Sequence, residues 1–219
     1  MLYFIVNEKS RSGKGAAVWR EVQETLHAEK VAYKAWVTEY EGHALALARE
    51  ICARDDDDIC LVALGGDGTA NEVINGITDF ERVRFGVIPT GSGNDMARGL
   101  GITGNPTENL KRILACMQTD KAQCRTIDLG EVRYKGGETS RLFAISSGLG
   151  LDAIVCKKAL KSKLKDTLNK LHLGKLTYLL LTVQTLFSMH TTNASVRYEK
   201  KDTQHFKEFI YIAAMNFKA

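Results

Sequence analysis

The sequence predicts an α/β fold in which a parallel sheet covered by helices precedes an antiparallel, β-rich region. Up to residue 121, short apolar runs alternate with stretches in which apolar residues recur at helical spacing. Several of these runs end in a glycine-bearing polar loop, which is typical of the carboxyl ends of strands in open α/β sheets. After residue 121 the pattern changes to paired runs joined by short turns, which favours hairpins. We therefore expect an α/β domain over residues 1–121 and an incomplete, β-rich domain with inserted helices over residues 122–219.

The first domain is expected to contain four buried strands, over Leu2–Val6, Ala32–Val37, Ile59–Leu64 and Phe85–Ile88. Helices are expected between them and after them. The first packs through Val18, Trp19, Val22 and Leu26, the second ends near Ala53, and the third begins near Thr69. A further helix starts at Asn105-Pro106, a cap followed by a first-turn proline, with a core stripe of Leu110, Ile113, Leu114 and Met117.

The second domain is expected to contain two antiparallel pairs of strands with helices between them. The pairs are Ala122–Val132 with Thr139–Ser147, turning at Lys135–Gly137, and Asn193–Glu199 with Phe206–Asn216. The helices are predicted over Asp152–Leu173 and Lys175–His190.

Composition sets broad limits on function. The 219 residues are 44% hydrophobic and 26% charged, which is ordinary for a globular protein. The net charge of +4 is mild and does not indicate binding to nucleic acid. The five cysteines are scattered without a C-x-x-C pair, which predicts reduced thiols in a cytoplasmic protein rather than a disulfide frame or a zinc site. No run is apolar enough to span a bilayer, so any contact with lipid is expected to be peripheral.

The strongest motif is the glycine turn Gly65-Gly66-Asp67-Gly68, between a buried strand and a helix. Glycines let the backbone approach a ligand closely, and the amides of the turn and of the following helix form a natural phosphate cradle. A carboxylate at a phosphate site is repulsive unless a cation lies between them, so Asp67 indicates a divalent metal. The alternative is a tight turn without a ligand.

Two other loops follow predicted strands. The Pro89–Arg98 loop again joins a strand to a helix and brings Ser92, Asn94 and Asp95 to the same sheet edge. The Asn7–Gly15 loop lacks Walker A spacing, and by itself a plain strand-to-helix turn is the favoured interpretation. His43 and the acidic run Asp55–Asp58 are interpreted as structural and as surface features, respectively.

Taken together, Gly65–Gly76 and Pro89–Asp95 resemble the diacylglycerol kinase catalytic-domain family, which includes soluble bacterial lipid kinases and is related to sphingosine and ceramide kinases. Further matches lie at Asn7–Lys14, at Thr38 with Gly42–Ala44, and in the stretches Thr126–Gly130 and Ser147–Ala153, so the resemblance covers nearly the whole chain. It implies an N-terminal domain that binds ATP across its mouth, with Mg²⁺.

The resemblance also implies roles for individual residues. The nucleotide would be bound by Asn7, Ser10, Gly13, Thr38, Gly65, Gly66, Asp67, Gly68, Thr69, Ala70, Asn71, Glu72 and Ser92. Asp67, Asp95 and Asp128 would form the acidic network that holds Mg²⁺ and its waters. Glu8 stands where the family has proline, and Ser92 stands where it has threonine. The general base and further metal ligands of the family are expected beyond residue 219, so no catalytic base is assigned.

A basic amphipathic helix is predicted over Asp152–Leu173. Four leucines share one face (Leu160, Leu164, Leu168 and Leu171), and six lysines surround them (Lys157, Lys158, Lys161, Lys163, Lys165 and Lys170). This pattern suits an anionic membrane surface, while the alternative is a helix whose leucines pack on the core.

The leading hypothesis is therefore an ATP- and Mg²⁺-dependent lipid kinase that phosphorylates a lipid hydroxyl, most simply diacylglycerol, giving phosphatidic acid. One alternative is an NAD kinase-like enzyme, which shares the Gly-Gly-Asp-Gly turn. Another is a non-catalytic nucleotide-binding or membrane-docking form. Unpaired strand edges such as Phe206–Asn216 predict self-association. No motif identifies the lipid.

Overall fold

The computed structural model describes residues 1–118, 124–161, 174–197 and 202–216. Within them the chain forms two compact units, one of residues up to Ile145 together with Asn216 and one of residues from Ser146 to Met215. The first hairpin of the predicted second domain thus belongs to the first unit. The domain boundary near residue 121, which rests on the change of sequence pattern there, stays a prediction.

The first unit is built on a four-stranded parallel sheet in the order β2-β1-β3-β4. Its strands are β1 (Leu2–Val6), β2 (Tyr33–Val37), β3 (Ile59–Gly65) and β4 (Val83–Pro89). The helices of this unit are α1 (Ser10–Ala28), α2 (His43–Cys52), α3 (Asp67–Gly76), α4 (Asp95–Gly99) and α5 (Pro106–Gln118). The predicted parallel α/β fold is confirmed.

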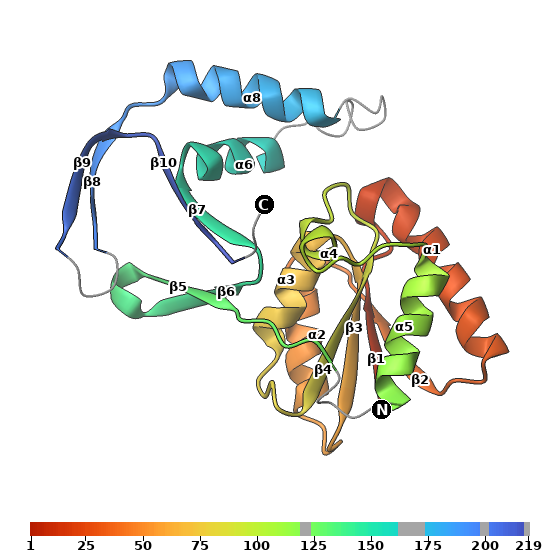
Figure 1. Ribbon diagram of the computed structural model, residues 1–219. Coiled ribbons are helices and arrows are strands. Elements are labelled where there is room, and N and C mark those ends of the chain that lie inside the picture. The colour runs from red at the N-terminus through yellow and green to blue at the C-terminus, as the bar shows by residue number, and fades with distance from the viewer. Residues whose placement is uncertain (119–123, 162–173, 198–201, 217–219) are drawn as a thin grey trace. The chain divides into compact units, whose positions relative to one another are not determined.

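The alternation of side chains along the strands divides the core between the two faces of the sheet. Phe4, Val62 and Leu64 pack with Trp19, Val22 and Leu26 of α1 and with Leu110 of α5. Tyr3, Ile5 and Leu61 pack with residues of α2 and α3. Figure 1 shows the same arrangement, with α2 and α3 on one side of the sheet and α1 and α5 on the other. Because helices cover both faces of the sheet, its buried strands are continuous apolar runs in the sequence.

Helix α5 begins with the predicted cap. Asn105 Oδ1 accepts the Glu108 backbone N–H at 2.8 Å, and Glu108 Oε2 accepts the Asn105 N–H at 3.2 Å. This reciprocal pair is a capping box, which satisfies amides that have no partner inside the helix. Pro106 occupies the first helical position, where its missing N–H costs nothing.

The antiparallel region differs from the prediction in its strand boundaries. The predicted strand over Ala122–Val132 is wrong for residues 124–129, which are irregular, and β5 begins only at Gly130 and ends at Tyr134. Ile127 and Leu129 instead pack on the core, and the Asp128 carbonyl accepts a bond from the Asn216 side chain. Contacts with the core thus replace a strand partner. The turn at Lys135–Gly137 is confirmed, and β6 (Thr139–Phe143) pairs with β5.

Two other predicted strands are each split into two. The predicted strand over Thr139–Ser147 ends at Phe143, because Asn216 donates hydrogen bonds to the carbonyls of Ala144 and Ile145. A separate strand, β7 (Ser146–Gly150), follows and does not pair with β5. Phe206–Asn216 breaks at Ile210, whose carbonyl accepts the Leu151 N–H at 2.9 Å. The resulting strands are β9 (Gln204–Phe209), paired with β8 (Thr192–Val196), and β10 (Tyr211–Met215), paired with β7.

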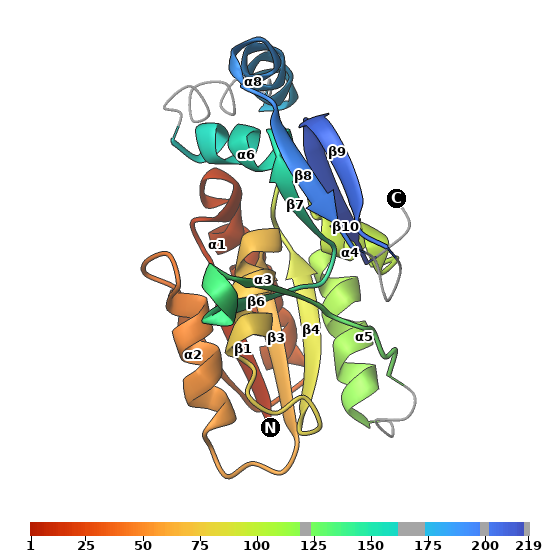
Figure 2. The ribbon, with the colours of Figure 1, turned by 90° about the vertical axis from the view of Figure 1, so that its left-hand side faces the viewer.

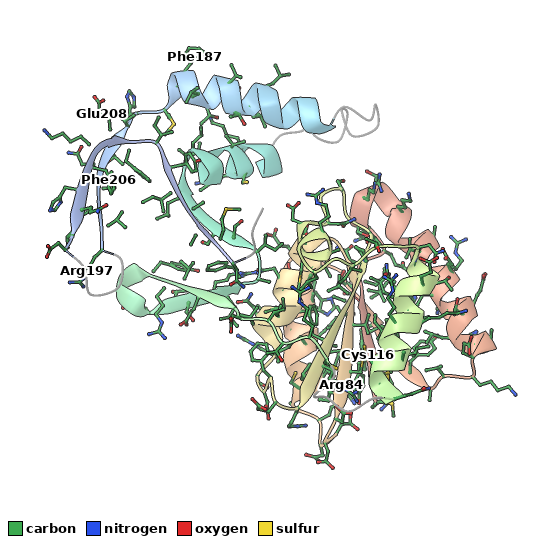
Figure 3. All side chains as sticks on the ribbon, in the orientation of Figure 1. Arg84, Cys116, Phe187, Arg197, Phe206 and Glu208 are labelled. Atoms are coloured by element: carbon green, nitrogen blue, oxygen red, sulfur yellow. The ribbon has the colours of Figure 1, made fainter. Side chains whose placement is uncertain are left out.

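The second unit also contains α6 (Leu151–Lys161) and α8 (Gly174–Ser188), which lie side by side in Figures 1 and 2. Lys158 Nζ of α6 donates to the buried Thr185 hydroxyl of α8 at 3.0 Å. Phe187 points away from α6 and is 87% exposed (Figure 3). Most of the predicted basic amphipathic helix, residues 162–173, lies outside the described residues. No helix in the described part of the chain is long and apolar enough to cross a membrane.

Candidate functional site

The candidate site lies at the carboxyl ends of the four parallel strands, where each strand passes into a loop. The first residues of three loops continue the sheet ladder. Asn7 N–H bonds the Leu64 carbonyl, Thr38 N–H bonds Val6, and Thr90 N–H bonds Gly65, each at 2.8 Å. The loops therefore leave the sheet in register and along one edge, which is where open α/β sheets bind ligands.

The two glycine loops touch each other through their backbones. A Cβ placed on Gly91 would lie 2.8 Å from the Gly66 Cα, and a Cβ on Gly65 would lie 2.6 Å from the Thr69 Cβ. Real side chains do not tolerate such distances, so Gly91 allows the two loops to pack together, and Gly65 allows the turn after β3 to pack against its own Thr69. The glycines at these positions are required by packing.

Gly68 has a different environment. It lies in the first turn of α3, and a Cβ added there would meet no atom within 4 Å. Packing does not require a glycine at this position. The space beside it, at a helix N-terminus whose first amides lack intrahelical partners, suits the close approach of a phosphate.

Asp67 connects the two glycine loops. Its Oδ1 accepts the backbone N–H of Met96, in the first turn of α4, at 3.0 Å. Its Oδ2 lies beside Gly93, as does Asp95 Oδ2, since a Cβ on Gly93 would be 3.2 Å from the first oxygen and 3.6 Å from the second. Asp95 also pairs with Arg98. One oxygen of Asp67 is thus a structural cap, and the other lies beside Gly93, as does an oxygen of Asp95.

Side chains tie the loop after β1 to both glycine loops. Asn7 Nδ2 donates to Thr69 Oγ1 at 3.0 Å, and the hydroxyls of Ser10 and Thr90 lie 2.6 Å apart. The start of α1 that carries Ser10 has an unusual backbone, because Arg11 and Ser12 have φ of 46° and 57° before Gly13 at 92°. Left-handed conformations cost non-glycine residues about 1 kcal/mol each. Strain of this kind is concentrated at functional sites.

Together these loops line a cavity of about 450 Å³ within the first unit. The glycine turn, the loop after β1 and the loop after β2 all contribute. Its lining residues are Asn7, Lys9, Ser10, Arg11, Thr38, Glu39, Tyr40, Glu41, Ala44, Gly66, Gly68, Thr69, Glu72 and Gly91. A cavity of this size accommodates a small-molecule ligand.

Of the thirteen residues predicted to bind nucleotide, seven line this cavity: Asn7, Ser10, Thr38, Gly66, Gly68, Thr69 and Glu72. Glu72 also accepts the Gly42 N–H at 3.0 Å, which fixes the loop before α2. Lining a cavity does not establish a ligand, so the nucleotide assignment of these residues stays a prediction.

The other predicted residues have different surroundings. Ala70 is buried in the core, and Asn71 Nδ2 donates to the Leu142 carbonyl of β6 at 3.0 Å. Gly65 closes β3, Asp67 links the loops, and neither Gly13 nor the exposed Ser92 is among the lining residues. In the second loop it is the buried Thr90 that meets Ser10.

Several lining residues were not predicted from the sequence: those of the loop after β2 beyond Thr38, together with Lys9, Arg11, Ala44 and Gly91. The only signal for Glu39, Tyr40 and Glu41 was their position directly after a predicted strand. Lys9 Nζ donates to the Glu39 carbonyl at 3.3 Å, so these two loops are joined as well.

The predicted acidic network is only partly assembled. Asp67 and Asp95 share the neighbourhood of Gly93, whereas Asp128 contributes its backbone carbonyl to Asn216. Among residues 1–118, 124–161, 174–197 and 202–216, no three His, Cys, Asp or Glu side chains gather as a metal cage. Mg²⁺ is usually held by one or two carboxylates together with substrate phosphates. The pair beside Gly93 fits that mode, and ligation by Asp128 stays a prediction.

The chain is similar in sequence to known proteins. Residues 1–132 match the family described as "Diacylglycerol kinase catalytic domain". Among curated relatives, the Bacillus subtilis (strain 168) protein named "Putative lipid kinase YtlR" is 32% identical over 80% of this chain and 56% of its own length. The "Diacylglycerol kinase" of the same strain is 34% identical over 73% of this chain and 47% of its own. The chain thus spans about half the length of these relatives.

Solved structures share the fold. The crystal structure of a diacylglycerol kinase from Bacillus anthracis str. Sterne has a TM-score of 0.66 and 24% identity, covering 100% of this chain and 64% of that one. At this identity the likeness concerns the fold alone, and it includes both the parallel sheet and the antiparallel strands that follow it.

Proposed function

Because the chain belongs to the diacylglycerol kinase catalytic-domain family, we propose that it binds ATP with Mg²⁺ as part of a lipid kinase. The reaction is transfer of the γ-phosphoryl group to a lipid hydroxyl, that of diacylglycerol in the simplest case, which gives phosphatidic acid. Phosphoryl transfer depends mainly on positioning and on neutralising the charge of the phosphates. The described residues offer groups for positioning the phosphates and for neutralising their charge.

The observation that carries the proposal is the open space beside Gly68 in a cavity otherwise built from tightly packed loops. Gly65 and Gly91 are needed for packing, but Gly68 is not, and its amide lies at the N-terminus of α3. A triphosphate in this space would receive hydrogen bonds from backbone amides and would be stabilised by the helix dipole. Lys9 and Arg11, which line the same cavity, add positive charge.

Asp67 and Asp95 are the residues proposed to hold Mg²⁺. Oδ1 of Asp67 is committed to the Met96 amide, so Oδ2 is the oxygen that would reach a cation or its water. When bound, Mg²⁺ neutralises charge on the phosphates during transfer. Asp67 would therefore have two roles, fixing the loop after β4 and orienting the cation.

The same proposal includes a lipid as the acceptor. It also includes a cytoplasmic location, with peripheral binding to the membrane surface. Support comes from the second unit, where Leu180, Val183 and Phe187 of α8 are exposed. No residue of this chain is assigned as the general base.

Titration of Mg·ATP against the chain by calorimetry tests nucleotide binding without requiring an acceptor. The informative variant is Asp67→Asn, which keeps a carbonyl oxygen for the Met96 amide but removes the charge. We expect magnesium-dependent binding that Asp67→Asn loses and that Asp57→Asn, an exposed control before β3, retains. Binding by Asp67→Asn equal to that of the unaltered chain, with and without magnesium, would contradict the metal assignment.

The acceptor is tested with diacylglycerol in mixed micelles and Mg·ATP, following phosphatidic acid. Formation of NADP from NAD by the same preparation, without phosphorylation of lipid, would contradict the lipid assignment.

A further inference from the structure

The part of the cavity farthest from β4 contains an aromatic pair that the roles described above do not use. The Tyr40 and His43 rings are stacked, with centroids 4.5 Å apart and an angle of 5° between their planes. His43 is held in turn, because its Nδ1 accepts the Glu39 backbone N–H at 3.1 Å. Tyr40 lines the cavity and yet is 63% exposed. One face of its ring is covered by His43, so the other face is available to a ligand.

The order of the strands places this pair at a defined position along the cavity. In the order β2-β1-β3-β4, the loop that carries Tyr40 follows β2 and the glycine turn follows β3. Two strand spacings, about 10 Å, separate the ends of these strands. A ligand whose phosphates lie beside Gly68 therefore reaches Tyr40 only with a part that extends away from its phosphates.

Charge along the lining is mixed, because Lys9 Nζ donates to the Glu39 carbonyl and the Glu72 carboxylate of α3 also lines the cavity. The lining residues on either side of Tyr40 in the chain are Glu39 and Glu41. Carboxylates repel a triphosphate but not an uncharged ring. The surroundings of Tyr40 therefore suit a neutral, flat group better than phosphates.

We propose that Tyr40, backed by His43, is the platform on which the adenine ring of the nucleotide stacks. This inference rests on the proposed function and adds the residue that recognises the base. The tyrosine ring is already oriented by His43 before a ligand arrives, so binding costs little side-chain entropy. Stacking of a base on an aromatic ring gives at least about a fivefold gain in affinity.

The test compares two probes by calorimetry, Mg·ATP and Mg·tripolyphosphate, which has a similar phosphate chain but no base. Tyr40→Ala should weaken ATP binding by about fivefold or more and leave tripolyphosphate binding unchanged, while Tyr40→Phe should keep both. Tyr134→Ala, which truncates an exposed tyrosine of β5 that does not line the cavity, is the matched control and should change neither.

A second readout follows the base itself. Stacking on a tyrosine ring shifts the adenine H2 and H8 proton resonances upfield on binding. The shift should persist in Tyr40→Phe and disappear in Tyr40→Ala at saturating ATP. If Tyr40 had a purely structural role, the upfield shift would persist in Tyr40→Ala.

The outcomes separate this inference from the function on which it rests. If the unaltered chain binds neither probe, the proposed nucleotide site is overturned and the platform with it. If it binds ATP but Tyr40→Ala binds equally well, or loses both probes in parallel, the platform alone is overturned. A loss confined to ATP, together with the loss of the ring shift, establishes it.

Discussion

At the scale of single residues, the glycines of the two loops differ in what they do. A Cβ on Gly91 would lie 2.8 Å from the Gly66 Cα, whereas a Cβ on Gly68 meets nothing within 4 Å. The same substitution should therefore damage the fold at one position and only ligand binding at the other. Sequence alone gives no way to tell these glycines apart.

We expect Gly91→Ala to lower the free energy of unfolding by about 1–3 kcal/mol, because the loops must move apart to admit the methyl group. Gly68→Ala should leave it unchanged or raise it by up to about 1 kcal/mol, since alanine favours the helix. Gly68→Ala should nevertheless weaken Mg·ATP binding, because the methyl group occupies the space for phosphate. Denaturant unfolding of both variants measures the change in stability, and calorimetry measures the affinity for Mg·ATP. Wild-type affinity in Gly68→Ala would contradict the phosphate site.

Cys60 is a second residue whose chemistry is set by its position. Burial raises the pKa of its thiol from the ordinary value of 9.0 to about 12. Nearby, Arg84 Nη1 donates to the Cys116 carbonyl at 2.6 Å (Figure 3). The thiolate is the reactive form, so the native protein should resist alkylation at this position.

At pH 8 we expect iodoacetamide to modify Cys60 in denaturant but not in the native protein, as read by peptide mass spectrometry. The unfolded chain releases this proton near pH 9, while the folded chain retains it to about pH 12. The free energy of unfolding should therefore fall as pH rises between these values, and less steeply in Cys60→Ala. Equal alkylation of native and denatured protein at pH 8 would refute the assignment.

At the scale of elements, α3 and β6 are joined by side chains instead of by a ladder of backbone bonds. Asn75 Oδ1 accepts the Leu142 N–H at 2.8 Å, and Asn75 Nδ2 donates to the Leu142 carbonyl at 3.0 Å. Asn71 Nδ2 donates to the same carbonyl, and Arg141 Nη2 donates to Asn71 Oδ1 at 3.2 Å. Two asparagines one helical turn apart thus anchor β6 on α3, the helix that begins at the glycine turn (Figure 2).

Asn75→Ala should lower the free energy of unfolding by about 2 kcal/mol, because both of its bonds to Leu142 are lost and the peptide groups lose their partners. Hydrogen exchange at the Leu142 amide should accelerate even where the rest of β6 stays protected. Asn193→Ala, at an exposed position on β8, is the control and should have little effect. Unchanged exchange at Leu142 in Asn75→Ala would show that the anchor is not energetically significant.

At the scale of the whole molecule, the four-stranded sheet separates two cores within the first unit. Leu26 of α1 is fully buried on one side, and Ile51 of α2 is buried on the other. These residues belong to different clusters and share no packing partners among the core residues. The sheet itself is the connection between them.

Leu26→Ala and Ile51→Ala should each lower the free energy of unfolding by about 2–5 kcal/mol through lost burial and a residual cavity. In the double variant the two losses should add within about 0.5 kcal/mol, because the sites lie on opposite faces. Leu186→Ala, a half-exposed residue of α8, serves as the control for a mild change. Urea unfolding monitored by circular dichroism measures all four proteins, and a large departure from additivity would mean that the faces are coupled through the sheet.

The sequence by itself determined the parallel sheet, the order of its elements, the cap of α5 and the turn at Lys135–Gly137, all of which depend on local patterns. Periodicity and turn chemistry depend on residues that are close together in the chain, so these features can be predicted from the sequence. The same patterns located the glycine turn, and the family resemblance indicated half of the residues that line the cavity.

Only the tertiary structure decided the rest. Asn216 takes the carbonyls that end β6, Ile210 divides β9 from β10, and Asp67 binds an amide of the other loop. Tyr40 lines the cavity because β2 lies beside β1 at the sheet edge. Each of these depends on contacts between residues far apart in the chain, and such pairings leave no periodic signal in a single sequence.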